Sequence, residues 1–238
     1  MQEYGCEDQE HPDELLCMGL GKFIPKQLVC GAHLFKHSWR IDVDRVLGFT
    51  NINDPANGLL LIKPLEEAFD NGYMCITWEG KKGADRAQGD YRMLWLGPKE
   101  LQLHDTKHYP WKNSGDKLPT DQQLQLRELK NEEGFRLRFS DLHGKLLTFR
   151  TSARPFRRCL IFQARYAARQ ALAEGRINEQ RLAEMSPYMV SVSPQASNIE
   201  LYWQRMPDEG PDLPLEPAPV EELVYDEAPE RLSDAEDQ

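Results

Sequence analysis

The sequence predicts an α+β fold, in which short strands and helices follow one another without an internal repeat. Two kinds of pattern lead to this prediction. Short runs rich in β-branched and aromatic residues are bounded by Gly, Pro, Asn and Asp, as is typical of strands that end in turns. Longer segments place apolar residues three and four positions apart, which is the spacing of one face of a helix. With 40% apolar residues in a chain of 238, we expect a packed core.

The stretch 17–80 is expected to form the core unit of the fold. Pro64 suits the first turn of a helix. Three apolar residues, Leu65, Ala68 and Phe69, share one face of that helix before an Asn-Gly pair ends it. The elements predicted here are, in chain order, a strand, a turn, an apolar run that leads into the helix, and a further strand: QLVCGAHLF (27–35), NINDPANG (51–58), GLLLIKPLEEAFDNG (58–72) and YMCITWEG (73–80).

After residue 80 the sequence predicts further strands and a closing amphipathic helix over about 155–177, followed by a last ordered element at 199–206. In the helix, apolar residues at three- and four-residue steps lie opposite a row of arginines. These are Leu160, Ala164, Ala167, Ala171 and Leu172 against Arg158, Arg165, Arg169 and Arg176. The strand candidates are YRMLWLG (91–97), FRLRFSDLHG (135–144) and LLTFR (146–150), with a hairpin over 142–150.

The charge of the chain is concentrated at one end. The net charge is −10, and residues 207–238 contain twelve acidic residues, one arginine and six prolines. The remainder, 1–206, therefore carries about +1. We expect three parts: an acidic, loosely held leader at 1–14, a folded domain at 15–206, and a disordered acidic tail at 207–238, since its composition is too polar and proline-rich to bury a core.

Cysteine usage and hydropathy predict a reduced, intracellular, soluble protein that is nuclear or cytoplasmic. The five cysteines are odd in number, widely separated and free of any C-x-x-C pair. That pattern argues against a disulfide framework and a ribbon-type zinc site. The chain begins with acidic residues rather than a signal peptide, and no apolar run of about 18 residues is present to span a membrane.

Three short motifs follow one another in the core unit: AH at 32–33, NGLLL at 57–61 and LEEAFDNG at 65–72. They resemble the HNH nuclease family, in particular the subgroup with A-H, then N-G-L-L-L, then L-H-x-x-F-D-x-G. The resemblance covers about a quarter of the chain. It implies a ββα-metal finger and a metal-dependent endonuclease that hydrolyses phosphodiester bonds. RPFRRCLIFQARYAARQA (154–171) is also similar to the helix that closes some proteins of this subgroup.

The resemblance assigns the catalytic base to His33 and gives Asn57 the task of tying the following loop to the strand. An imidazole suits this chemistry, because its unperturbed pKa of about 6.5 lies near working pH. A second interpretation of Asn57 stays open, since Asn-Gly is a common turn.

The chain departs from the family pattern at the metal position. Ala32 precedes the base where many HNH proteins have an aspartate, and Glu66 stands where the helix histidine ligates the metal. A carboxylate favours hard cations, so the implied cofactor is Mg²⁺ or Mn²⁺, held by Glu66 with Asp70. The alternatives are that Glu66 is a surface residue and that Asp70 accepts from a backbone amide of the next turn. A zinc site of Cys17 and Cys30 with His33 and a metal pair of His104 and His108 are weighed against buried thiols and a surface loop.

Basic residues near the motif and on the closing helix are candidates for binding phosphates of nucleic acid, with DNA favoured over RNA. They are Lys36, Arg40, Arg158, Arg165 and Arg169. Such residues give salt-dependent affinity that is independent of base sequence. The acidic tail is expected to bind this basic face or a protein partner. An alternative function is a catalytically degenerate interaction module that keeps the finger as a scaffold.

Overall fold

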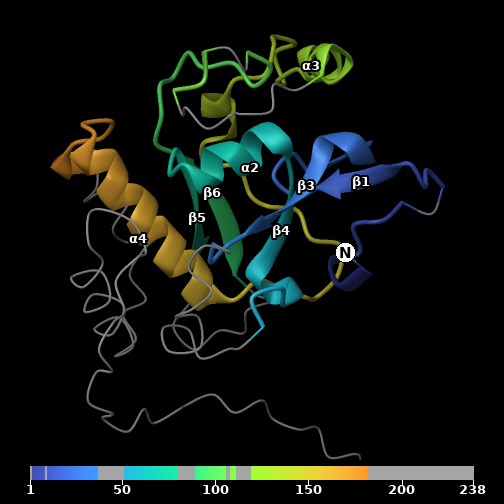
Figure 1. The fold of residues 1–238 in the computed structure, drawn as a ribbon, viewed down its shortest axis with the longest axis horizontal. Coiled ribbons are helices and arrows are strands. Elements are labelled where there is room, and N and C mark those ends of the chain that lie inside the picture. Colours follow the sequence, from blue (N-terminus) through green and yellow to red (C-terminus); the bar gives the residue numbers. More distant parts are fainter. Residues whose placement is uncertain are drawn as a thin grey trace, which may run out of the picture. The chain divides into compact units, whose positions relative to one another are not determined.

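The computed structural model describes residues 2–8, 10–36, 51–79, 89–105, 108–110 and 119–181. The chain divides into two units, Met1–Met206 and Pro207–Gln238, and every described residue lies in the first. The mixture of small antiparallel sheets and helices confirms the α+β class (Figure 1). No helix among the described residues is long and apolar enough to span a membrane.

Three two-stranded antiparallel sheets make up the β-structure of the described residues. The pairs are β1 (Glu14–Cys17) with β2 (Lys22–Pro25), β3 (Val29–His33) with β4 (Gly58–Ile62), and β5 (Met74–Glu79) with β6 (Asp90–Trp95). The helices are α2 (Lys63–Asp70), α3 (Thr120–Arg127) and α4 (Arg157–Ala173). Short 3-10 turns are η1 (Gln2–Tyr4), η2 (Lys26–Leu28), η4 (Pro55–Asn57) and η7 (Phe139–Leu142).

The unit β3–β4–α2 follows the predicted order of elements. In the β3–β4 register His33 lies opposite Gly58, so the histidine stands where the two strands part. Helix α2 buries the predicted face, including Leu65 and Phe69. The helix ends at Asp70, and Gly72, two residues further on, has a φ of 67°, in the left-handed region that glycine adopts without strain.

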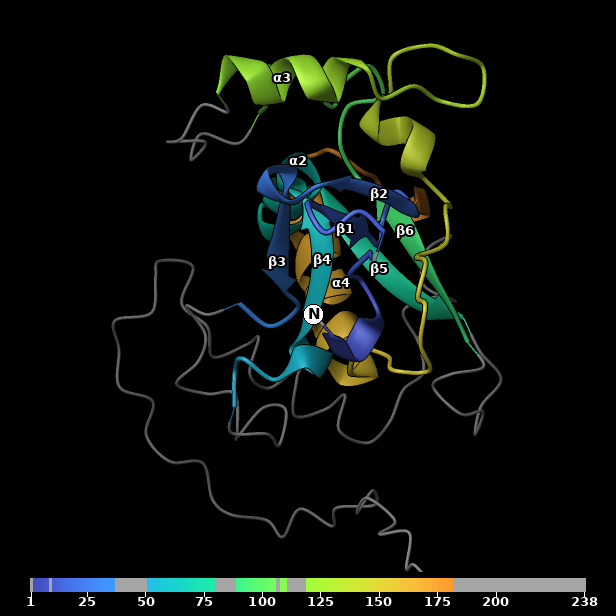
Figure 2. The ribbon, with the colours of Figure 1, turned by 90° about the vertical axis from the view of Figure 1, so that its right-hand side faces the viewer.

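Helix α4 lies along β5 and closes the back of the finger (Figures 1 and 2). Its Phe162 ring packs 5.0 Å, between centroids, from the ring of Phe35, just after β3. The buried Gln163 Nε2 donates to the carbonyls of Phe69 at 3.2 Å and Met74 at 3.1 Å. Since these carbonyls flank the end of α2 and the start of β5, α4 fixes the position of the site-bearing helix. The predicted closing helix is therefore present.

Two predicted strands and a hairpin are wrong. The alternation in 135–144 indicated a strand, but Asp141 Oδ2 accepts from Arg138 N at 2.9 Å and caps η7 instead. The stretch 146–150 forms one isolated bridge, from Leu146 to Arg92. The segment 142–150 does not fold back on itself, because its backbone follows β6: Gly144 N donates to Met93 O and Leu147 N to Tyr91 O.

The N-terminal residues are more ordered than the expected loose leader. Tyr4 and Cys6 are buried, and the Tyr4 hydroxyl donates to Pro55 O at 2.9 Å. The hairpin β1–β2 then pairs Leu16 with Phe23. Leu16 N also donates to Cys6 O at 2.9 Å. This hairpin and α3 were not among the predicted elements. The last predicted element, at 199–206, lies outside the described residues.

Candidate active site

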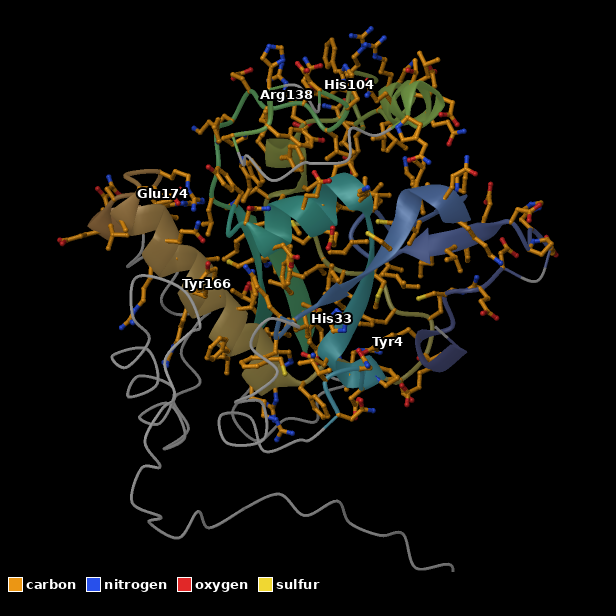
Figure 3. The ribbon with its side chains drawn as sticks, in the orientation of Figure 1. Tyr4, His33, His104, Arg138, Tyr166 and Glu174 are labelled. Atoms are coloured by element: carbon orange, nitrogen blue, oxygen red, sulfur yellow. The ribbon has the colours of Figure 1, made fainter. Side chains whose placement is uncertain are left out.

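His33 occupies the last position of β3 and is half-buried (Figure 3). Its Nε2 lies 3.3 Å from Oδ1 of Asn53, in the loop before η4. The imidazole also interacts electrostatically with the carboxyl group of Asp70 on α2. The ring therefore lies near both the Asn53 side chain and the Asp70 carboxyl group, and it is only partly buried.

Asn57 is fully buried and fastens the chain that follows β3 to the turn that precedes β4. Its Oδ1 accepts from Phe35 N at 2.9 Å, while its Nδ2 donates to Phe35 O at 3.2 Å and to Ile52 O at 2.9 Å. The cap of η4 comes from another residue, since Asp54 Oδ1 accepts from Ala56 N at 2.8 Å. The side chain of Asn57 is thus used for bridging two segments rather than for making its own turn.

Glu66 and Asp70 form a half-buried carboxyl pair one turn apart on α2. Burial, with the nearby charges of Asp70 and Glu67, raises the pKa of Glu66 to about 7. Burial also raises the pKa of Asp70, whereas Lys36 and His33 lower it. A hydrogen bond from protonated Glu66 to Asp70 favours the neutral form of Glu66 and the ionised form of Asp70. Glu66 is therefore partly protonated near neutral pH, and its proton is shared with Asp70 through their hydrogen bond.

Lys36 lies against the same pair rather than on an open surface. Its Nζ donates to the main-chain oxygen of Asp70 and stands 4.7 Å from the ring centroid of Tyr166 on α4. Burial lowers the pKa of Lys36, while Asp70 raises it. An ammonium at a helix C-terminus is favourable for the helix dipole. Two groups that act on the Asp70 carboxyl are therefore Lys36, through its charge, and Glu66, through a hydrogen bond. The alternative partner considered from the sequence was a backbone amide.

The donor set of the site fits a hard divalent cation. Magnesium commonly keeps several waters and binds through one or two carboxylates together with substrate phosphates. Glu66 and Asp70 could supply two carboxyl oxygens to such an ion, and binding would require the loss of the proton on Glu66. In the described part of the chain, no group of three or more His, Cys, Asp or Glu residues is arranged as a metal cage. Two carboxyl groups are fewer ligands than the four of a structural zinc site, so the pair does not fit one.

Among the described residues, the other candidate ligands do not belong to any group of three or more possible metal ligands. Cys17 is buried, and its Sγ accepts from Ile62 N at 3.3 Å. The Sγ of Cys30 donates to Leu61 O at 3.6 Å. His104 is buried, whereas the exposed His108 pairs with Asp105 at 2.7 Å. The buried-thiol interpretation therefore holds for Cys17, and His108 has a carboxylate partner of its own.

The predicted phosphate-binding arginines differ in their surroundings. Arg158 is half-buried, with its guanidinium 4.6 Å from the ring of Phe156, while Arg169 is exposed. Arg165 lies between them on the same stripe of α4 and is half-buried. Arg40 lies outside the described residues. Arg176, from the same predicted row, donates to the carbonyls of Gly72 and Leu96 and so serves the packing of the helix end.

Sequence reasoning missed Asn53 and the burial of Lys36. Asn53 belongs to NINDPANG, whose residues indicated only a turn. Nothing in such a composition says which strand end the turn will contact, because that depends on the β3–β4 pairing. Lys36 was predicted as a candidate phosphate-binding residue from its proximity to the motif in sequence. Its contact with Tyr166 requires α4, which is more than a hundred residues away.

A strand pair followed by a helix, with a histidine at the strand end and acidic residues on the helix, defines a ββα finger. Residues 10–77 match the family model described as HNH endonuclease, which confirms the resemblance of this segment to HNH nucleases. No curated protein and no solved structure matches the chain.

Replacing Glu66 by Gln should stabilise the protein at pH 8 and leave it nearly unchanged at pH 5. Because the folded-state pKa of Glu66 is raised to about 7, its stabilising contribution is complete below the unfolded pKa of about 4.5 and is lost as the pH rises through about 7. Gln keeps a neutral donor to Asp70 throughout. We expect a gain of roughly 1–2 kcal/mol at pH 8, discounted for partial exposure. Thermal unfolding at both pH values measures it.

The matched control is Glu128→Gln, at an exposed glutamate after α3. It should show the same small change at both pH values. A Glu66→Gln effect that does not grow between pH 5 and pH 8 would contradict a shared proton.

Proposed function

We propose that the protein is a metal-dependent HNH-type endonuclease that hydrolyses phosphodiester bonds of nucleic acid, with DNA as the favoured substrate. The observation that carries this proposal is the position of His33 at the end of β3, where it interacts electrostatically with Asp70 of α2, within the segment that matches HNH endonucleases. A base and an anionic pair for a cation are the two elements that phosphodiester hydrolysis by water requires.

In this proposal each residue has a separate task. His33 accepts the proton of the attacking water, for which its half-exposed position gives access. Asn57 holds the backbone on both sides of the base in place. Glu66 and Asp70 would hold Mg²⁺ or Mn²⁺. When bound, such an ion supplies positive charge that stabilises the phosphate and the leaving oxygen in the transition state.

The substrate backbone would follow the arginine stripe of α4. Arg158, Arg165 and Arg169 are spaced seven and four residues apart, which places them along one line of the helix. The N-terminal end of α4 adjoins the turn of Asn57, because Phe156 N donates to Ala56 O at 2.8 Å. A phosphate chain along this stripe is therefore led toward the loop that carries Asn53 and Asn57. Arg40 belongs to the same proposed basic set, whereas Lys36 has partners within the site.

The test is cleavage of supercoiled plasmid, linear duplex and single-stranded RNA by the purified full chain. We expect nicking in Mg²⁺ or Mn²⁺ and none with a chelator. The double variant Glu66→Gln with Asp70→Asn serves as the metal-site control, since both amides preserve shape while removing charge. Cleavage that survives the chelator, or that the double variant retains in full, would overturn the metal assignment.

The second candidate is an interaction module that keeps the finger without catalysis. It is favoured by Glu66 standing at the position of the family's helix histidine, and by the described residues offering two rather than three acidic or imidazole donors. This candidate predicts salt-dependent binding of nucleic acid or binding of a protein partner without strand scission in any metal. The same cleavage assay, combined with binding measurements, separates the two.

Replacing Glu66 by His should move the metal preference from Mg²⁺ and Mn²⁺ toward Ni²⁺ or Zn²⁺. Imidazole is a softer ligand than carboxylate, so affinity for borderline metals rises and affinity for hard cations falls. Cleavage rates across the four metals, supported by calorimetric binding, measure the change. Glu66→Ala is the control that removes the ligand. An unchanged metal profile in Glu66→His would show that Glu66 takes no part in metal binding.

Deleting residues 207–238 should tighten binding to nucleic acid at low salt and leave thermal stability nearly unchanged. The deletion takes the net charge from −10 to about +1, which removes repulsion of phosphate and any competition by the acidic tail for the basic residues. The gain should fade with salt, since the Debye length is roughly 10 Å at 0.1 M. Titration against labelled DNA and RNA at several salt concentrations measures it. Equal affinity at low salt would leave the tail without an electrostatic role.

A further inference from the structure

The hydrogen bond between His33 and Asn53 bears on which ring nitrogen of the imidazole is basic. His33 Nε2 lies 3.3 Å from Asn53 Oδ1, and an amide oxygen only accepts hydrogen bonds. Nε2 must therefore carry the hydrogen in this arrangement. In a neutral imidazole the other nitrogen, Nδ1, then holds the basic lone pair. The contact thus selects one of two tautomers.

The loop that carries Asn53 is held at several points. Asn51 Oδ1 accepts from the backbone N–H of Asn53 at 3.1 Å, and Asn51 O accepts from Asp54 N at 3.0 Å. The preceding carbonyl, of Ile52, accepts from Asn57 Nδ2 at 2.9 Å. Because the backbone is fixed on both sides of Asn53, its side chain meets the imidazole in a defined place rather than by chance.

We propose that Asn53 is a positioning residue that holds His33 in the Nε2–H tautomer, so that Nδ1 is the atom that accepts the proton of water. Asn57 then acts on the base by two routes. One runs through Phe35 on the strand side, and the other runs through Ile52 to Asn53 on the loop side. This inference deepens the proposed endonuclease function and rests on it only for the identity of the proton that Nδ1 accepts.

The test is the ¹⁵N spectrum of the histidine rings in the full chain at pH 8, with the His33 signals identified by their loss in His33→Ala. We expect a protonated-type signal at Nε2 and an unprotonated-type signal at Nδ1. Asn53→Ala should shift both signals toward the averaged values of a tautomer mixture. Asn53→Asp should retain the wild-type pattern, because a carboxylate accepts but cannot donate.

The matched control is Asn178→Ala, at an exposed asparagine after α4 that should leave the His33 signals unchanged. A wild-type signal with the hydrogen on Nδ1, or His33 signals that do not respond to Asn53→Ala, would overturn the proposal. Where cleavage is measured, Asn53→Ala should lower kcat roughly 10- to 100-fold, and Asn53→Asp should restore part of it. A fixed tautomer in a protein without cleavage would refute the endonuclease function and support the positioning role of Asn53.

Discussion

His33→Ala should abolish metal-dependent cleavage while the protein stays folded. A positioned general base contributes typically 10²–10⁴-fold to a rate, so we expect the cleavage rate to fall by at least about 10²-fold. The side chain is half-buried at a strand end, and its removal leaves the β3–β4 pairing and the Asn57 bonds in place. The free energy of unfolding should therefore change by less than about 2 kcal/mol. Plasmid nicking and thermal unfolding of the same preparation give both numbers.

The matched control is His108→Ala, which removes an exposed histidine whose partner is Asp105. It should keep the wild-type rate. If His33→Ala unfolds, the imidazole is a structural residue of the finger. If the stable variant cleaves at the wild-type rate, His33 has no part in the reaction.

Local patterns predicted the finger because its elements are short and continuous in sequence. Pro64, the apolar face of α2 and the Gly72 terminator all act within one helix, so a single sequence contains the information for it. The apolar row of α4 was predictable for the same reason. In each of these elements the apolar residues recur with the period of the secondary structure, and most of the same residues are buried in the folded protein.

The remaining features depend on contacts between distant segments. FRLRFSDLHG has strand-like alternation, yet its backbone pairs only in isolated bridges and Asp141 caps a 3-10 turn. The leader looked too acidic to pack, but Tyr4 reaches Pro55, about fifty residues along the chain. In the candidate site, the positions of Glu66 and Asp70 followed from helical spacing. Their shared proton follows from burial, and the extent of burial cannot be predicted from the spacing of residues in the sequence.

Asn57→Asp should destabilise the protein by about 2–4 kcal/mol, although the substitution preserves shape and Asp is as good a turn former as Asn. The loss follows from the buried donor. Nδ2 donates to the carbonyls of Phe35 and Ile52, and a carboxylate oxygen in its place repels both. Asn57 does not adopt a positive φ, so the backbone does not require an asparagine there. A turn residue alone would thus tolerate Asp with a change below about 0.5 kcal/mol.

Chemical denaturation at pH 7 distinguishes the two interpretations of Asn57, with Asn51→Asp as the matched control. Asn51 is exposed in the same loop, and it uses its side-chain oxygen as an acceptor, which Asp retains. That control should therefore remain near wild-type stability. Because Asn57 supports the chain after the base and the loop of Asn53, its loss should also lower cleavage in whatever fraction remains folded. A stable Asn57→Asp variant with wild-type cleavage would show that Asn57 is an ordinary turn residue. The orientation of His33 would then depend only on Asn53 and on the register of the β3–β4 pair.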